Sequence, residues 1–424
     1  MKLLLAIVGN LAVAWMLWRW LRAQRHVAGF RYVLVPALVL RLLSGAISVV
    51  RPTSDAKYYY YWSQWLSKQL WNEPAGWLKT LAGEEFRFAG KKLIFHGYSN
   101  SFFFIKLLSG LNLLTGGSML LTAIYLSLIS FLGCWAAVQV FGRVLPGTKG
   151  AAILGLLFWP SSLYWSSGIT KECLLMASSA GLVASAIVLL YGNPERRWLW
   201  MLLGLFCAWL NFKMRFFYGG VLLAVLLALT VVRVAQRLTA LKKRWQVVVF
   251  AFTLGLGALA ASEVSPVFRF NKFASQLTRT YSALQQKSVG RPHIALPHLA
   301  PTAESIARYT PKAVASALLR PFAWEGDSMF YGSAALENLA LLVLMASACW
   351  DLGNRQHRQA LPFALALALL TYCFVLAALL GLSTPNLGTL SRYRAPMLPM
   401  LVMVLSCQPT VANLLRRMRV FVLR

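Results

Sequence analysis

The sequence predicts an all-α polytopic membrane protein with about eleven transmembrane helices, and three observations support this class. Of the 424 residues, 58% are hydrophobic and only 13% are charged, whereas a soluble domain carries about 25% charged residues. Apolar stretches that approach the roughly 20 residues needed for one membrane crossing recur from end to end. Lys and Arg, which give a net charge of +30, fall largely between these stretches, as topology signals do. We therefore expect membrane lipids, not nucleic acid, as the partner of this charge.

The hydrophobic pattern defines the expected spans along a single membrane domain over residues 1–424. The spans are 3–18, 33–50, 119–141, 151–166, 173–191, 198–211, 217–234, 246–262, 334–350, 360–381 and 396–412. The first span resembles a signal peptide, but bulky residues together with Arg19 and Arg22 occupy the place of a small-residue cleavage site. We therefore expect it to remain as the first helix.

The connections between the spans predict the topology. Alternate connections are basic, so the positive-inside bias places them in the cytoplasm: 19–31, 141–149, 193–197, 233–245, 351–358 and 414–424. Two long segments, 51–118 and 263–333, then lie on the external side, and their aromatic and basic composition suits the membrane surface. The apolar piece 101–116 is short and contains Lys106, so we expect a juxtamembrane helix there.

The cellular location follows from the same topology. The chain contains no N-x-S/T sequon, so nothing indicates a glycosylated lumenal surface. We expect a bacterial inner membrane protein whose long external segments face the periplasm. The six cysteines lie in or at the ends of apolar runs without a CxxC pair, which argues against disulfides and structural zinc.

The stretch SDAKYYYYWSQW (54–65) places a carboxylate, Asp55, directly after the second span. Only 12 carboxylates occur in the chain. At the boundary between apolar chain and water a carboxylate is partly desolvated, which raises its basicity and suits it to accept a proton from a hydroxyl. The alternative is structural: Ser54 or Asp55 would cap a short amphipathic helix, and the tyrosines would form an interfacial belt.

Lys171 and Glu172 begin another predicted helix at the external surface, after the Pro- and Ser-rich turn of residues 159–170. Glu172 at a helix N-terminus is stabilised by the helix dipole, which would explain it without any function. Lys171 opposes that dipole unless an anion lies nearby. We expect a lipid phosphate or Glu172 itself as that anion.

Four further basic residues lie in short external turns, against the positive-inside bias: Lys213, Arg215, Arg392 and Arg394. Arg binds phosphate through two parallel hydrogen bonds and Lys binds it as a point charge. These residues could together hold a phosphate or pyrophosphate leaving group. Contacts with lipid headgroups or with external carboxylates are the alternative.

The segment 317–342 carries three more charged residues of interest. Arg320 and Glu325 precede a predicted helix, and Glu337 lies about one turn inside it. An ionisable residue within a span indicates a functional site, and we expect one of the external arginines as its partner. His293 and His298 lie in a Pro-rich loop and are weak evidence for a metal site. No Walker motif, GxGxxG, HExxH or GxSxG occurs, so external chemistry would need a donor that is already activated.

Four motifs in chain order carry a resemblance to a known class: SDAKYYYYW (54–62), GYSNSFFFIKLLSGLNLLTGGS (97–118), FGRVLPGTKGAA (141–152) and WPSSLYWSSGITKE (159–172). Their order and topology resemble the GT-C class of polytopic glycosyltransferases, which use polyprenyl-phosphate or polyprenyl-diphosphate sugars. RPFAWEGDSMFYGSAALEN (320–338) and RYRAP (392–396) are similar to uncharacterised bacterial membrane proteins grouped with such enzymes.

The resemblance implies a transferase that moves a sugar from a polyprenyl-linked donor to a lipid, glycan or protein acceptor, with inversion. Asp55 would be the general base and Glu172 would position the base or the acceptor. Many members carry two adjacent acids, whereas Asp55 is followed by Ala56 and Lys57. A divalent metal therefore stays open, and no residue is assigned as a metal ligand.

The expected substrate-binding residues combine the external basic set with two neighbours: Lys171, Lys213, Arg215, Arg320, Glu325, Arg392, Arg394 and Tyr58. Two other functions are compatible with the same composition. An O-antigen-type polysaccharide polymerase would share the location and the carrier lipid. A lipid or glycolipid transporter would use the aromatic and basic external segments as gates.

Overall fold

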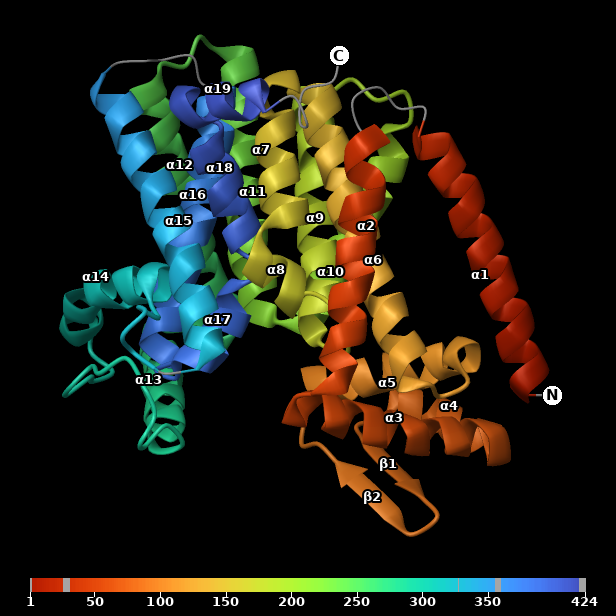
Figure 1. Ribbon diagram of the computed structural model, residues 1–424. Coiled ribbons are helices and arrows are strands. Elements are labelled where there is room, and N and C mark those ends of the chain that lie inside the picture. Colours follow the sequence, from red (N-terminus) through yellow and green to blue (C-terminus); the bar gives the residue numbers. More distant parts are fainter. Residues whose placement is uncertain (1, 26–30, 327, 355–359, 419–424) are drawn as a thin grey trace.

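The computed structural model describes residues 2–25, 31–326, 328–354 and 360–418. Helices packed side by side form a bundle, and a short hairpin lies at one end (Figure 1). In the described part of the chain, eight helices are individually long and apolar enough to cross a membrane. They are α1 (Lys2–Arg25), α2 (Arg31–Val50), α6 (Met119–Val144), α9 (Lys171–Tyr191), α11 (Phe216–Leu238), α12 (Lys243–Val264), α15 (Met329–Gly353) and α16 (Phe363–Ser383). The predicted class, an all-α polytopic membrane protein, is confirmed.

Two of the spans predicted as continuous helices are interrupted, so the prediction is wrong there. Residues 151–166 form α7 (Lys149–Ile153), a π-helical turn (Leu154–Phe158) and α8 (Pro160–Trp165). Residues 396–412 form α18 (Leu398–Ser406) and α19 (Pro409–Arg417), which meet at 87°. In both places a proline starts the second piece, since it has no N–H to continue the preceding helix. A third predicted span, 198–211, is a helix, α10 (Arg197–Met214).

A buried arginine and a buried glutamate hold the interrupted α7–α8 segment. Arg41 of α2 is 1% exposed, and its guanidinium donates to the carbonyls of Leu156 at 3.2 Å and Ser162 at 3.3 Å. Glu337 of α15 accepts from the backbone N–H and the hydroxyl of Ser161, both at 2.6 Å. These contacts satisfy backbone groups that an interrupted helix leaves unpaired. Among the described contacts Glu337 forms no ion pair with an arginine, although its charge acts on Arg394; the expected arginine partner stays a prediction.

The first long segment folds as α3 (Ser54–Asn72), α4 (Pro74–Ala82), the hairpin β1 (Glu85–Phe88) and β2 (Lys91–Ile94), and α5 (Asn100–Thr115). The helix expected over 101–116 is thus present as α5, and its place at the membrane surface stays a prediction. Thr53 caps α3, because its hydroxyl accepts from the Ala56 N–H at 3.2 Å. The expected caps Ser54 and Asp55 instead lie in the first turn, which leaves the Asp55 carboxylate available for another partner.

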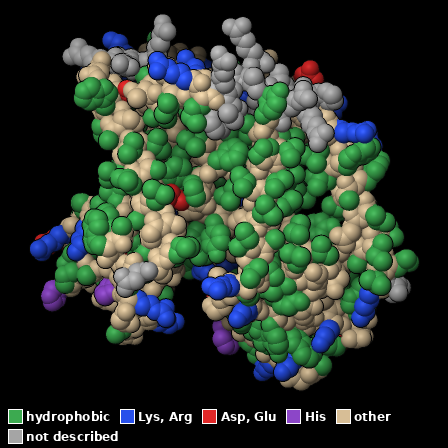
Figure 2. Space-filling view, in the orientation of Figure 1, with side chains coloured by type: hydrophobic (Ala, Val, Ile, Leu, Met, Phe, Trp, Pro, Cys, Tyr) green, Lys and Arg blue, Asp and Glu red, His purple; other side chains and the backbone are tan. Residues whose placement is uncertain are grey.

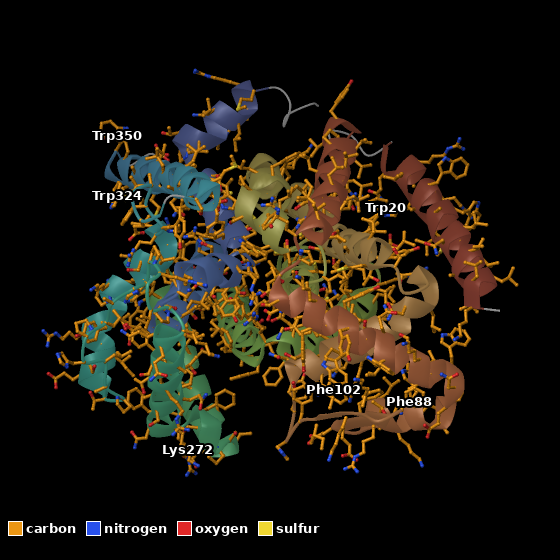
Figure 3. The ribbon with its side chains drawn as sticks, turned by 60° about the horizontal axis from the view of Figure 1, so that its bottom comes forward. Trp20, Phe88, Phe102, Lys272, Trp324 and Trp350 are labelled. Atoms are coloured by element: carbon orange, nitrogen blue, oxygen red, sulfur yellow. The ribbon has the colours of Figure 1, made fainter. Side chains whose placement is uncertain are left out.

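The second long segment folds as α13 (Phe270–Gln286) and α14 (Ala303–Leu319) and lies at the same end of the bundle as the first (Figure 1). Seen from that end, Lys272 of α13 and Phe102 of α5 lie on opposite sides of the face (Figure 3). Between the two segments the short helix α17 (Leu387–Arg394) packs against α14 and α16. Asp327 and residues 355–359 and 419–424 of two basic connections lie outside the described residues, as do 26–30 of a third.

Candidate functional site

The end of the bundle that carries both long segments is divided into two lobes with a cleft between them, and Lys and Arg side chains lie at the edge of the cleft (Figure 2). One lobe contains α3 to α5 and the hairpin, and the other contains α13 and α14 (Figure 1). An ion pair joins α3 to α17 here. Arg392 donates from Nη1 to the Asp55 carboxylate at 2.7 Å, although the two residues are 337 positions apart.

Arg392 also faces a second carboxylate. Its Nε lies 3.7 Å from Glu172 Oε1, and the same oxygen accepts from Arg215 Nη2 at 2.7 Å. The side chains of Glu172 and Arg215 are 3% and 8% exposed, whereas Asp55 is 45% exposed. The pairs therefore form a row that leads from a solvent-facing carboxylate into the protein.

Charge balance keeps Arg392 ionised despite its burial. Burial lowers the pKa of Arg392, but the carboxylates of Glu172 and Asp55 outweigh this and raise it above its ordinary value. The guanidinium thus carries a full charge between two acids. Such a group can exchange one anionic partner for another, because an incoming phosphate offers oxygens in similar geometry.

Lys171 completes what we call the charge cluster, which consists of Asp55, Lys171, Glu172, Arg215 and Arg392. Its ammonium donates to Asn100 Oδ1 at 3.0 Å and Ser101 Oγ at 3.3 Å, both in the first turn of α5. Within the described residues it makes no ion pair with a carboxylate. Glu172, one of the two partners expected from the sequence, is therefore not paired with it.

Aromatic side chains surround the charge cluster. The Arg215 guanidinium lies 4.0 Å and that of Arg392 5.1 Å from the ring centroid of Tyr393, within the range of cation–π attraction. The Tyr218 hydroxyl donates to the Tyr393 carbonyl. Tyr59 lies below Lys171, 5.4 Å from its ammonium, and burial raises the pKa of Tyr59 to about 12. The Tyr393 ring thus makes a cation–π contact with both arginines of the charge cluster, and the Tyr59 ring makes one with Lys171.

Sequence reasoning missed Tyr59, Tyr218, Tyr393 and Asn100. The signal for Tyr393 was its position inside RYR, between two external arginines. Nothing in the sequence distinguished Tyr59 from its neighbours in YYYY. Tyr58 packs edge-on against Tyr59, with ring centroids 5.9 Å apart, and is 39% exposed, so its contact with substrate stays a prediction.

The structure places the remaining predicted residues in other contacts. Arg394 is 1% exposed and donates to the carbonyls of Ala317, Leu318 and Arg320 and to Asn338 Oδ1. Arg320 pairs with Glu325, whose other oxygen accepts from the Phe322 N–H at 2.8 Å. Lys213 lies 4.3 Å from the ring centroid of Tyr98. Their roles in substrate binding stay predictions, and the contacts described do not include Asp55 or Glu172.

Among the described residues, no group of three or more His, Cys, Asp and Glu side chains is placed to hold a metal ion. No protein-family model, curated protein or solved structure matches the chain. In the charge cluster a half-exposed carboxylate, a buried carboxylate, two arginines and a lysine thus lie together at one end of the bundle.

Proposed function

We propose that the protein is a GT-C-type glycosyltransferase of the bacterial inner membrane, which transfers a sugar from a polyprenyl-(di)phosphate donor to an acceptor at the periplasmic face. The observation that carries the proposal is the position of Asp55. Its carboxylate is half-exposed at the start of α3 and is linked through Arg392 to the buried Glu172–Arg215 pair. One place thus offers a base for the acceptor and cations for a departing phosphate.

The proposed reaction is a single displacement. Asp55 takes the proton from the acceptor hydroxyl, whose oxygen attacks the anomeric carbon. A bond from that oxygen to the carbon forms while the bond to the phosphate oxygen breaks, and the lipid phosphate leaves with the electron pair. Attack from the side opposite the phosphate inverts the anomeric configuration. Arg392, Arg215 and Lys171 stabilise the negative charge on the leaving phosphate.

Arg392 links the two halves of this mechanism. In the free protein it holds the Asp55 carboxylate at 2.7 Å. A donor phosphate that takes over this guanidinium would release Asp55 for the acceptor hydroxyl. Donor binding would thereby activate the base only when there is a sugar to transfer, and Glu172 would keep Arg215 in position throughout.

The proposed topology follows from the number of membrane crossings and from the side on which the basic connections lie. Besides the eight long apolar helices, the bent pair α18–α19 is one more candidate span. With α10 and the interrupted α7–α8 segment each crossing once as well, the chain would make about eleven crossings. The basic connections between spans would face the cytoplasm. The cleft and the charge cluster would then face the periplasm, where polyprenyl-linked sugars are displayed.

The test is substitution of Asp55→Asn in the purified full chain. We expect transfer from polyprenyl-phosphate-linked hexose to fall by at least about a hundredfold, the usual contribution of a general base, while thermal unfolding stays unchanged. The matched control is Glu85→Gln, since Glu85 is also an exposed carboxylate paired with an arginine of its own segment, Arg87, at 2.8 Å. A folded Asp55→Asn protein that retains full activity would contradict the role of Asp55.

The released lipid distinguishes the candidate functions. Polyprenyl phosphate, or polyprenyl diphosphate from a diphosphate-linked sugar, released with one transferred sugar supports the transferase. Diphosphate released from an oligosaccharide-diphospholipid together with chain growth indicates a polymerase. Movement of the intact lipid without release of either product indicates a transporter and contradicts the proposal.

A further inference from the structure

A second site lies away from the charge cluster, where α1 meets α3, α5 and α6. α1 is a membrane-spanning helix, but little of it is buried against the rest of the protein. It approaches α5 closely at Gly9, where an added Cβ would lie 2.6 Å from Leu114 Cδ2. Between Leu3 and Leu17 a groove of about 640 Å³ separates α1 from α2 and α6, lined mostly by aliphatic side chains such as Leu11, Leu42, Ile124 and Leu128. Beyond the groove α1 meets α6 again, where Gln24 Oε1 accepts from Trp135 Nε1 at 3.2 Å.

The polar side chains of this groove are already satisfied within the protein. Asn10 donates to the Leu114 carbonyl at 2.7 Å and accepts from the Tyr125 hydroxyl at 2.6 Å. Thr115 accepts from Thr122 at 3.2 Å and donates to Asn112 at 3.3 Å. The groove therefore presents hydrocarbon to whatever fills it. Because it runs beside a membrane-spanning helix, the matching occupant is an acyl chain.

A smaller cationic pocket of about 150 Å³ continues the groove at the end that carries α3 and α5. Gly116 lines both spaces. Lys2 and Lys68 line the smaller pocket together with Gln64, Trp71 and Asn112, and no carboxylate is among its described lining residues. Lys2 lies 5.2 Å from the ring centroid of Trp71, which ties the start of α1 to the end of α3. The Lys68 ammonium lies 4.4 Å from the ring centroid of Trp65, so both lysines contact aromatic rings and retain a positive charge that suits an anion.

We propose that the groove and the pocket together bind one anionic glycerophospholipid, with an acyl chain between α1 and α6 and the phosphate between Lys2 and Lys68. The two halves match the two ends of such a lipid in charge, polarity and order along the membrane normal. This site is separate from the charge cluster, since Lys68 lies 13 residues after Asp55 on α3, or about 20 Å along the helix. The proposal is thus independent of the enzymatic function.

The headgroup is tested by native mass spectrometry of the purified full chain in a mild neutral detergent. Phosphatidylglycerol and phosphatidylcholine with identical chains are added in turn, and the fraction of lipid-bound protein is measured. Both lipids carry a phosphate, but the choline cation cancels its charge in phosphatidylcholine. With about 1 kcal/mol for each lysine near a net anionic headgroup, phosphatidylglycerol should bind up to roughly thirtyfold more tightly. The variant Lys2→Gln/Lys68→Gln should lose this preference. Equal binding of both lipids by the unmodified protein, or an unchanged preference in the variant, overturns the proposal.

The matched control keeps the change in charge but moves it elsewhere in the same segment. Lys79 of α4 and Lys92 of β2 are exposed and do not line the pocket. Lys79→Gln/Lys92→Gln should keep the preference for phosphatidylglycerol. If this control loses it as well, the preference reflects the overall charge of the segment and the site is not supported.

The acyl chain is tested by filling the groove. Ala14 lines the groove and Ala12 does not, and both are exposed on α1. Ala14→Phe should reduce retention of both lipids several-fold, and Ala12→Phe should leave it unchanged. Equal retention by the two variants overturns the assignment of the groove. Displacement of phosphatidylglycerol by a lower concentration of polyprenyl phosphate would overturn the assignment to a glycerophospholipid.

Discussion

Arg392 and Arg394 lie two residues apart on α17, yet they occupy opposite kinds of environment. Arg392 meets the carboxylates Asp55 and Glu172 and is 17% exposed at its side chain. Arg394 is buried and meets neutral oxygens, namely three backbone carbonyls at the end of α14 and Asn338. Burial accordingly lowers the pKa of Arg394 to about 10, with a smaller opposing effect of Glu337, whereas the pKa of Arg392 is raised.

This difference separates a structural arginine from one that can exchange partners. The carbonyls around Arg394 belong to the C-terminal end of a helix and need a donor whatever else the protein does. The carboxylates around Arg392 have alternatives: Glu172 keeps Arg215, and Asp55 can turn to water. Under the proposed function, an incoming phosphate would displace the partners of Arg392 but not those of Arg394. The motif RYR would then contain one residue that stabilises the fold and one that binds substrate.

The largest effect on stability is expected at the buried pair of the charge cluster. Glu172→Gln leaves Arg215 as a buried cation without a full countercharge, which costs about 3–5 kcal/mol. Arg215→Gln should cost a similar amount, and the double variant should recover part of it. Chemical unfolding of the four proteins in detergent measures the coupling. Additive losses would contradict a direct pair.

Arg394→Met is expected to destabilise the protein by about 3 kcal/mol, because several buried carbonyls and Asn338 lose their donor at once. The folded fraction after a heat challenge, followed by size-exclusion chromatography, measures this. Transfer by the fraction that remains folded should stay close to normal. If Arg394→Met unfolds like the unmodified protein, Arg394 is not the structural member of the pair.

Arg392→Met should show the reverse behaviour. We expect transfer to fall by about a hundredfold, as when one preorganised donor to a developing anion is removed. The free energy of unfolding should fall by only about 1 kcal/mol, because the Asp55 pair is exposed on one side and Glu172 retains Arg215. Initial rates and unfolding curves of this variant and Arg394→Met, measured side by side, test the comparison directly. Equal rates in the two folded variants would contradict it.

The smallest effect is expected at Arg320, which pairs with Glu325 outside the charge cluster. Because the side chains of Arg320 and Glu325 are only 19% and 12% exposed, Arg320→Gln should cost about 1–3 kcal/mol in stability. It should change transfer by less than about fivefold, or about 1 kcal/mol of activation free energy, because the contacts described for Arg320 include no member of the charge cluster. A hundredfold loss of activity would instead restore Arg320 to the substrate-binding residues that the sequence predicted, and would place the donor phosphate nearer α14.

Much of the fold could be predicted because apolar helices of spanning length are a local property of the chain. The helix α5 was equally visible as a short apolar run that contains Lys106. The interruptions before α8 and α19 were missed although Pro160 and Pro409 mark them, because the apolar pattern continues across both prolines. The hairpin β1–β2 was missed because four-residue strands are too short for a period of two to stand out.

The membership of the charge cluster could be predicted only in part. Asp55, Lys171, Glu172, Arg215 and Arg392 were all identified, since charged residues are rare in an apolar chain and those in external turns run against the positive-inside bias. Arg320, Glu325 and Arg394 passed the same test but lie in other contacts. Composition and topology predict on which side of the membrane a charged residue lies, but they do not predict which side chain it contacts.

The sequence by itself thus determined that this is a multi-spanning α-helical membrane protein and which scarce charges deserve study, because hydrophobicity and charge act locally along the chain. Only the tertiary structure decided that Asp55 pairs with Arg392 and that Glu172 pairs with Arg215. It also decided that Arg394 donates to the carbonyls at the C-terminal end of α14. Those pairings join helices that are 43 to 337 residues apart along the chain. Burial then makes each choice costly to reverse, because a charge removed from water must keep the partner that the packing provides.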